Sequence, residues 1–413
     1  MQRYWGRPAM KLILPAGRSA EAQLAGLAGA RLAAFDQRSL AFLGDFSERI
    51  LADPTLRPYP ELIALGYWFR PSAIARLHQR YRGIAGPGVV RPRGIVLHFA
   101  PANVDTLFAY SWFIALLCGN RNIVRLSARQ SPAQERLLAL LADLLAAPRH
   151  EAVAAASAII GYAHDDAIST DLSRRCQVRV VWGGDETVRH IRRLPLSPLA
   201  TELVFANRYS WTLLSARAVL AVPEDGLARL ATAFFNDAFW FDQQACASPR
   251  SVLWIGDDDV ITAAQRRFWA AIGGELAVRG MYGQPGQLMS RITAAHLMAA
   301  SGASASAPDG VAAWPLRLAV DRLDASLREA HCGHGLFCEL RRAHLDDSAD
   351  LFSPVDQTVG YWGLERAELL GWIGRLADGA VDQVVPVGQA LNFDDVWDGH
   401  DLLMAFSRVL VLR

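Results

Sequence analysis

Gly94-Ile95-Val96-Leu97-His98-Phe99, followed by Ala100-Pro101-Ala102-Asn103, opens a regular alternation of strands and helices. The short apolar run is typical of a buried strand, and the residues after it indicate a turn. A helical pattern then covers residues 106–118, Gly119-Asn120 is suited to cap that helix, and a second strand is predicted at residues 122–126. Strand, helix and strand in this order predict a parallel βαβ unit.

The same alternation continues along the chain. We expect a helix over residues 132–147, strands at 158–160, 177–182 and 202–205, and a helix from 185 to 193. A second series of strands and helices follows, with a strand at 211–214, a helix at 226–241 and a strand at 251–255. The sequence therefore predicts an α/β fold with two α/β domains. The expected division is a helical region at 1–90, a first domain at 91–211, a second at 212–385, and a segment at 386–413 that returns to the body.

The N-terminal part is expected to be helical from residue 19 to about residue 81, with breaks at Pro54, Pro58 and Pro60. The aromatic cluster at 67–70 either lines a pocket or belongs to the core, and core is the commoner outcome. The few apolar residues before Pro15 are too short for a secretion signal. The longest apolar segment, 107–118, is too short to cross a bilayer, so no membrane span is expected.

Charge and cysteine content narrow the function classes. Lys and Arg number 42 against 41 Asp and Glu, so no overall field attracts nucleic acid or an anionic membrane. Five cysteines without CxxC spacing argue against a disulfide framework and favour a reduced, cytoplasmic location. A cluster of His331, Cys332, His334 and Cys338 suggests either a metal site or an ordinary polar loop. The polar loop is preferred because no second ligand cluster exists, so no metal is expected.

Cys246 is the candidate nucleophile. The predicted helix over residues 226–241 leads to it, and Pro249 is expected to end that helix. Small neighbours leave room for a substrate carbonyl, while the amides of Gln243 and Gln244 can donate hydrogen bonds to a thiolate or an oxyanion. The alternative is a buried structural cysteine, because free cysteines are among the most buried residues.

A glycine pair suggests a second site. Gly183-Gly184 follows a predicted strand and begins a helix, which is where doubly wound folds bind nucleotide phosphates. The chain has no GxGxxG motif here, so a simple strand-to-helix turn is the alternative.

Several blocks, in order, carry a family resemblance. The chain resembles the aldehyde dehydrogenase superfamily and, within it, is most similar to LuxC-like fatty acyl-CoA reductases. The resemblance covers roughly residues 40–413 and rests on Pro101-Ala102-Asn103, Gly119 to Ser127, Gly183-Gly184, Phe205 to Ser210, Phe235-Asn236, Gln243 to Cys246, Asp356 to Gly360 and Trp397-Asp398-Gly399.

The resemblance implies a Rossmann-like NAD(P)-binding domain and a second, catalytic α/β domain. It implies that Cys246 is the nucleophile, that Asn103 supplies the oxyanion-hole amide, and that Gln244 supports the substrate or oxyanion. The implied cofactor-binding residues are Arg125, Ser127, Gly183 and Gly184. Arg125 replaces the usual lysine, and its planar fork suits a 2′-phosphate, which favours NADPH while leaving NADH open. Without the resemblance, Arg125 would be interpreted as a surface charge at the end of a strand.

One departure from the superfamily concerns the base that activates water. When Arg208 is aligned with the family lysine, the position of this base is occupied by Val204. Glu202 lies two residues before it. A reductase does not need this base. The resemblance thus implies NAD(P)H-dependent reduction of an acyl-CoA or acyl-carrier thioester to an aldehyde. The alternatives are an NAD(P)-dependent aldehyde dehydrogenase and a cofactor-free acyl-transfer protein that uses the same cysteine.

The resemblance also carries expectations about partners. Enzymes of this type often work beside an acyl-activating or acyl-transferring enzyme and commonly form homo-oligomers. The acyl group remains open between fatty, aryl and polyene chains, because aromatic residues in a large core and in an acyl tunnel give the same composition.

Overall fold

The computed structural model describes residues 10–84, 88–101, 106–127, 131–301, 305–307 and 309–413. Contacts divide the chain into two compact units, one of residues 1–206 with 393–413 and one of residues 207–392. The expected division into independent domains near residues 90, 211 and 385 stays a prediction.

The first unit is built on a six-stranded sheet. Every neighbouring pair is parallel except the antiparallel edge pair of β1 and β5. Numbered from β3 along the chain, the parallel strands lie in the order 3-2-1-4-5, which is the Rossmann-type order. Across the sheet the strands are β1 (Lys11–Leu14), β5 (Ser157–Gly161), β4 (Arg121–Leu126), β3 (Ile95–Phe99), β6 (Val178–Trp182) and β7 (Thr201–Phe205).

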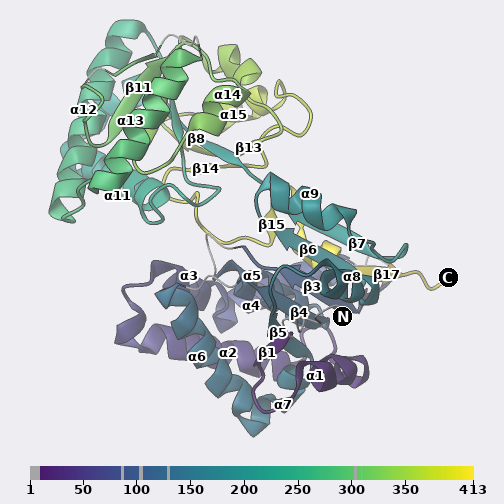
Figure 1. Cartoon of the computed structure of the whole chain (residues 1–413). Coiled ribbons are helices and arrows are strands. Elements are labelled where there is room, and N and C mark those ends of the chain that lie inside the picture. Colours follow the sequence, from purple (N-terminus) through teal and green to yellow (C-terminus); the bar gives the residue numbers. More distant parts are fainter. Residues whose placement is uncertain (1–9, 85–87, 102–105, 128–130, 302–304, 308) are drawn as a thin grey trace, which may run out of the picture. The chain divides into compact units, whose positions relative to one another are not determined.

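Helices cover both faces of this sheet (Figure 1). Alternating side chains of β3 show the two faces, since Val96 enters one apolar core and Leu97 and Phe99 enter the other. The first core includes α2 (Gln37–Ala52), α3 (Pro60–Trp68), α4 (Pro71–Ile84), α5 (Leu107–Leu117), α6 (Pro132–Ala146) and α7 (Glu151–Ala155). The second includes α1 (Ala20–Gly26), η1 (Leu27–Gly29), α8 (Asp166–Arg175) and α9 (Asp185–Arg193).

The predicted helical N-terminal part is confirmed, and the 3-10 turn η2 (Pro54–Leu56) lies between its helices α2 and α3. A second 3-10 turn, η3 (Pro148–His150), lies between α6 and α7. The aromatic cluster at 67–70 is only partly in the core, since Phe69 is fully buried and Tyr67 is 53% exposed. Helix α5, the longest apolar segment, is buried along nearly its whole length. Within the residues that the structure describes, no helix has the length and apolarity required to span a membrane.

The C-terminal segment, which was expected to return to the body, forms a helix and a strand near its end. Helix α16 (Leu402–Ala405) and Phe406 enter the core of the first unit. Strand β17 (Ser407–Leu410) then pairs with β2 (Val89–Pro92), and Leu412 is 77% exposed. Strands β15 (Val396–Trp397) and β16 (His400–Asp401) form a small hairpin before it.

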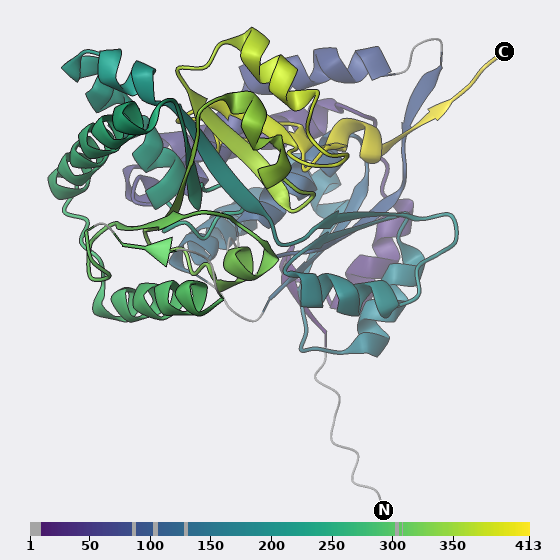
Figure 2. The ribbon, with the colours of Figure 1, turned by 90° about the horizontal axis from the view of Figure 1, so that it is seen from above.

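The second unit contains a seven-stranded sheet in which only β10 and β11 pair antiparallel. Helices α10 (Ala216–Ala221), α11 (Glu224–Phe239) and α12 (Asp258–Val278) pack on one face, and α13 (Pro285–Ala300), α14 (Ala325–Ala330) and α15 (Arg366–Ile373) on the other (Figures 1 and 2). The turn η4 (Leu345–Leu351) precedes β13. Across the sheet lie β10 (Ala305–Ser306), β11 (Leu316–Val320), β12 (Leu336–Arg342), β9 (Ser251–Ile255), β8 (Tyr209–Ser215), β13 (Asp356–Trp362) and β14 (Gln383–Pro386).

Candidate active site

Cys246 lies in a turn between α11 and β9, and its side chain is partly exposed. The helix ends at Phe239, two residues earlier than predicted, and Pro249 is not what ends it. The chain instead reverses at Asp242 and Gln243, whose φ angles of 52° and 58° place two successive non-glycine residues in the left-handed region. This backbone cannot continue a right-handed helix.

The turn lies at the amino edge of the second sheet. Strands β9 and β12 are parallel neighbours, with Ser251 opposite Cys338. The segments that precede them, residues 240–250 and 331–335, therefore meet at the same edge. We call these two segments the cysteine loop and the histidine loop.

The backbone of Cys246 is anchored by a strand residue. Ser210 on β8 donates a hydrogen bond of 2.7 Å from Oγ to the carbonyl oxygen of Cys246. The same Oγ accepts a hydrogen bond of 3.3 Å from the backbone N–H of Thr358 on β13. Ser210 and Thr358 are fully buried. Two neighbouring strands thus fix the position of the cysteine turn.

The block that contains Thr358 has a structural role. Asp356 is fully buried and accepts hydrogen bonds of 2.6 Å from Trp211 Nε1 and 2.9 Å from Arg328 Nη2. A buried carboxylate requires such partners. The family block from Asp356 to Gly360 therefore holds the start of β13 against β8, next to Ser210.

Gln243 does not point a free amide at the thiol, contrary to the sequence-based expectation. It is fully buried, and its Nε2 donates to the carbonyl oxygens of Pro249 and Leu336, each at 2.9 Å. Its Oε1 accepts a hydrogen bond of 2.6 Å from the N–H of Gly335. Gln243 therefore links the cysteine loop to the histidine loop.

Gln244 makes a second link. Its Nε2 donates to the carbonyl oxygen of Cys332 at 3.1 Å and lies 3.5 Å from that of Asp242. A Cβ at Gly333 would lie 2.5 Å from the same nitrogen, so a side chain there would displace the Gln244 amide, and the φ of 75° at this position favours glycine. Support of an oxyanion by Gln244 stays a prediction. In this structure the Gln244 amide nitrogen is bonded to the carbonyl oxygen of Cys332.

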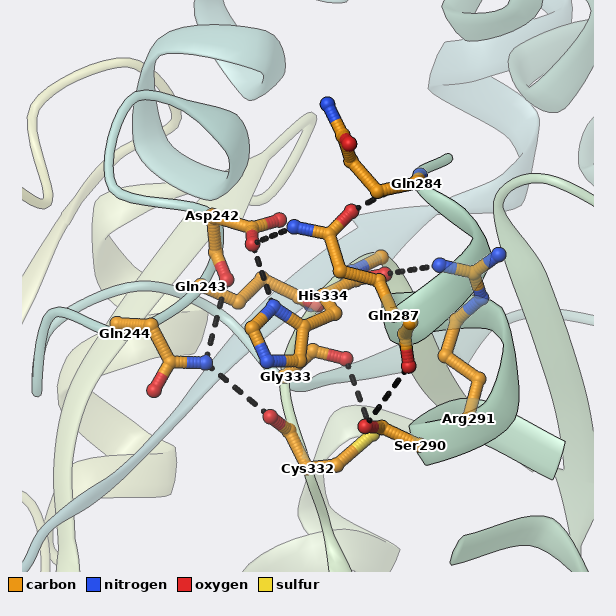
Figure 3. A network of polar contacts seen from close by, with 12 residues as sticks. Asp242, Gln243, Gln244, Gln284, Gln287, Ser290, Arg291, Cys332, Gly333 and His334 are labelled. Atoms are coloured by element: carbon orange, nitrogen blue, oxygen red, sulfur yellow. Dashed lines mark hydrogen bonds and ion pairs between the residues drawn. The ribbon is translucent and has the colours of Figure 1, made fainter. Parts of the chain in front are cut away.

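The sequence did not predict the contact between Asp242 and His334, which share a short hydrogen bond through Oδ2 and Nδ1 (Figure 3). Gln287 on α13 donates a hydrogen bond of 2.6 Å to the same carboxylate oxygen. The N–H of His334 also donates to the carbonyl oxygen of Asp242 at 3.1 Å. The cluster of His and Cys residues at 331–338 was the only sign in the sequence.

That cluster is arranged as a hydrogen-bonded loop. His331 donates from Nε2 to the carbonyl oxygen of Arg250 and accepts from the N–H of Gly333 at Nδ1, each at 3.1 Å. Burial lowers the pKa of His331 well below its usual value, so the ring is neutral. Among the described residues, no group of three His, Cys, Asp or Glu side chains is arranged to hold a metal ion.

The other cysteines, all of them described, are poorer nucleophiles. Cys118, Cys176 and Cys338 are buried, and burial raises the pKa of each thiol to about 12. Cys332 is partly exposed, and burial also raises its pKa. The thiolate is the reactive form, so these four are disfavoured.

The predicted cofactor residues lie in the first unit, at the carboxyl edge of its sheet. Arg125 lies near the end of β4 and Ser127 follows that strand, while Gly183 and Gly184 follow β6. The guanidinium of Arg125 donates to the carbonyl oxygen of Tyr162 at 3.4 Å and lies 5.3 Å from that ring. Asn103 lies outside the described residues. Since the strand order reverses between β3 and β6, this edge is where Rossmann-type folds bind nucleotides.

Negatively charged side chains follow the Gly183-Gly184 turn. Gly184 is the N-cap of α9, whose first turn contains Asp185 and Glu186. Both carboxylates pair with Arg189, that of Asp185 at 3.8 Å. Carboxylates at a helix N-terminus oppose the binding of an anionic phosphate at that end.

Glu202 is not available as a base. Its carboxylate pairs with Arg179 Nη2 at 2.9 Å and with Arg192 Nε at 3.3 Å. Arg179 is only 2% exposed, so this ion pair is part of the interior of the first unit. Val204, in the position of the superfamily base, packs against an apolar core.

Comparisons with known proteins agree with this architecture. A family model described as acyl-CoA reductase (LuxC) matches residues 77–285, about half of the chain. The long-chain acyl-protein thioester reductase of Aliivibrio fischeri is 25% identical over 171 residues, 41% of this chain. The match covers 33% of that relative, so the chain spans about a third of its length.

Solved structures show the fold. An NADP dependent enzyme from E. coli is 12% identical with a TM-score of 0.67, covering 98% of this chain and 94% of its own. An NAD-dependent aldehyde dehydrogenase from Sinorhizobium meliloti is 13% identical with a TM-score of 0.66, covering 95% and 86%. The predicted aldehyde dehydrogenase-like α/β fold is thereby confirmed.

Proposed function

Because the chain belongs to the acyl-CoA reductase (LuxC) family, we propose that it reduces an acyl thioester to an aldehyde through an acyl group held on Cys246. The observation that carries this proposal is the setting of the cysteine. Cys246 is partly exposed in a turn whose carbonyl is anchored by Ser210, whereas three of the other thiols are buried. A fixed, accessible thiol is what a nucleophile requires.

The chemistry needs one nucleophile and one site for negative charge. The Cys246 thiolate attacks the thioester carbonyl, and the proposed donors to the oxyanion are the Cys246 backbone N–H and the Asn103 amide. The tetrahedral adduct expels the substrate thiol and leaves the acyl group on Cys246. A bound nicotinamide supplies a hydride to that acyl group. Release of the aldehyde then restores the Cys246 thiolate.

Two residues of the first unit support the proposed direction of the reaction. An activated water would convert the acyl-cysteine to a carboxylic acid, which a reductase must avoid. Val204 cannot activate water, and Glu202 is held by Arg179 and Arg192. This supports reduction over oxidation of an aldehyde to an acid.

A nicotinamide cofactor fits the carboxyl edge of the first sheet. The similar E. coli structure is an NADP dependent enzyme, and that of Sinorhizobium meliloti is an NAD-dependent one. Arg125 at this edge favours NADPH, because a guanidinium pairs well with a 2′-phosphate. Arg125→Ala should raise KM for NADPH and leave KM for NADH nearly unchanged. Arg121→Ala, at the other end of β4, is the matched control.

The proposed substrate is a long-chain acyl group on CoA or on a protein thiol, as the name of the Aliivibrio fischeri relative suggests. The protein is incubated with each donor, first without and then with NADPH, and its intact mass is measured. We expect a gain of one acyl group that disappears with aldehyde release when NADPH is added.

Two variants make this test specific. Cys246→Ala should never gain the acyl group, whereas Cys332→Ala, which removes the partly exposed thiol of the facing loop, should behave as wild type. An acyl group that persists with NADPH and NADH would instead indicate an acyl-transfer protein. Absence of acylation with every thioester would rule out the proposed reaction.

A further inference from the structure

His334 is held as an oriented imidazole. Its Nδ1 contacts Asp242 Oδ2, so Nδ1 carries the proton that the carboxylate accepts, and Nε2 points away from Asp242 (Figure 3). Gln287 donates to the same carboxylate oxygen at 2.6 Å and fixes its rotation. The ring is 27% exposed. Within the described part of the chain, Nε2 has no hydrogen-bond partner, so it remains available to a ligand.

The backbone of both residues is constrained to make this contact. His334 has φ of 57° between Gly333 and Gly335 at 75° and 77°, and Asp242 has φ of 52°. The left-handed region is sterically unfavourable for a residue that carries a Cβ. Such strained residues concentrate at functional sites. Arg291 on α13 adds a further restraint, donating from Nη1 to the carbonyl oxygen of His334 at 2.9 Å.

The pair is coupled to the nucleophile by the same two loops. Asp242 precedes Cys246 by four residues. Between them, Gln243 bonds the N–H of Gly335 and Gln244 bonds the carbonyl oxygen of Cys332, so the residues on both sides of His334 are tied to the cysteine loop. Acyl-transfer enzymes pair a nucleophile with a histidine that a carboxylate orients. Here the oriented histidine stands on a loop that is hydrogen-bonded to the loop of Cys246.

We propose that His334, oriented by Asp242, donates the proton that the leaving thiol takes up when the substrate thioester acylates Cys246. This inference rests on the proposed function. When the tetrahedral adduct collapses, the bond from carbon to the substrate sulfur breaks, and its electron pair stays on that sulfur. The sulfur takes the Nε2 proton of the imidazolium, leaving a neutral imidazole and a free thiol. Solvent then reprotonates Nε2, which supplies the one proton that the overall reduction consumes.

Charged and titratable groups surround His334 from each packed element. The cysteine loop contributes Asp242, helix α13 contributes Arg291, and the histidine loop contributes His331 and Cys332. His331 is neutral, and the charged side chains that contact His334 are Asp242, at the ring, and Arg291, at the backbone carbonyl. The donating form is the imidazolium, whose Nδ1–H faces the Asp242 carboxylate.

The test compares leaving groups in the variant His334→Asn. Asparagine tolerates the left-handed backbone, and its amide can donate to Asp242, but it cannot titrate. The rate of Cys246 acylation is followed by rapid quench and intact mass, with one acyl chain on an alkyl thiol and on a more acidic arenethiol. We expect a loss on the order of 10²-fold with the alkyl thioester and a near wild-type rate with the aryl thioester, whose thiolate leaves without a proton.

Asp242→Asn should show the same dependence on the leaving group, and the exposed His344→Asn should match wild type. Equal slowing with both thioesters would overturn the inference, because misplacement of Cys246 affects both alike. Unchanged rates in His334→Asn would also overturn it. If wild-type Cys246 is never acylated, the proposed function fails, which is a distinct result from normal acylation that does not depend on His334.

Discussion

The hydroxyl of Ser210 donates a hydrogen bond of 2.7 Å to the carbonyl oxygen of Cys246, which ties the backbone of this proposed nucleophile to the sheet. Ser210→Ala leaves this carbonyl and the N–H of Thr358 without their partner, so the free energy of unfolding should fall by about 1–3 kcal/mol. Acylation of Cys246 should also slow. Denaturant unfolding and the acylation assay measure the two effects.

Ser248, in the same turn, is the matched control. Its hydroxyl is buried and has no hydrogen-bond partner among the described residues. Removing a buried hydroxyl that lacks a partner costs little, so Ser248→Ala should be neutral or slightly stabilising. A large loss in Ser248→Ala would mean that the turn depends on packing at both serines and would contradict the role given to Ser210.

His98 should make the first unit sensitive to acid. It is fully buried on β3, between Ser111 Oγ at 3.0 Å and Asn122 Oδ1 at 3.1 Å. Burial lowers the pKa of His98 to about 4, from 6.5. Between these values the unfolded chain binds a proton that the native protein does not, so the free energy of unfolding falls as pH drops. The slope is at most ~1.4 kcal/mol per pH unit.

Denaturant unfolding between pH 4.5 and pH 7.5 checks this slope. In His98→Gln, the amide can replace both hydrogen bonds without titrating. The variant should lose less stability than wild type as pH falls. Parallel curves for the two proteins would show that His98 does not titrate in this window.

Asp237 should produce the opposite slope in the second unit. This buried residue of α11 accepts hydrogen bonds from the N–H groups of Gly388 at 2.6 Å and Ala390 at 3.0 Å. Burial raises the pKa of Asp237 from 3.8 to about 7, although the two backbone bonds lower it. Between these values the native state keeps a proton that the unfolded chain has released. The free energy of unfolding therefore falls as pH rises through this window, by at most ~1.4 kcal/mol per pH unit.

Asp237→Asn removes the titration. The difference in the free energy of unfolding, wild type minus variant, should decline from pH 4.5 to pH 7.5, as measured in urea. A constant difference would show that the carboxylate is already ionised at low pH, held so by the two N–H groups.

Periodicity was enough to predict the five parallel strands of the first sheet, because buried parallel strands are continuous apolar runs such as residues 95–99 and 122–126. In the second sheet it predicted β8 and β9 but not β11, β12 and β13. Strand β1 was missed because it has only four residues before Pro15, and of these only Leu14 is buried. The end of α11 was misplaced because the sequence signal considered was Pro249, whereas the turn forms at Asp242 and Gln243. Left-handed non-glycine residues have no clear signature in a sequence.

The site was predicted in part. Cys246 stands out by its small and amide neighbours, but its surroundings come from distant segments. Asp242 and His334 are 92 residues apart, and no local pattern connects them. The amide of Gln243 looked available in the sequence, but it is fully bonded by residues just before β9 and at the start of β12. Which polar groups remain free at a site depends on tertiary contacts.

Gly333 offers a test of whether the two loops act together. Alanine there must adopt φ of 75°, and its Cβ would lie 2.5 Å from Gln244 Nε2, so the bond from Gln244 to Cys332 must break. Gly310, with φ of 84° and open space around it, is the control that has the backbone strain alone. Both variants should lose about 1–2 kcal/mol of stability, but only Gly333→Ala should also slow acylation of Cys246. Equal acylation rates in the two variants would show that the cysteine loop keeps its geometry without the histidine loop.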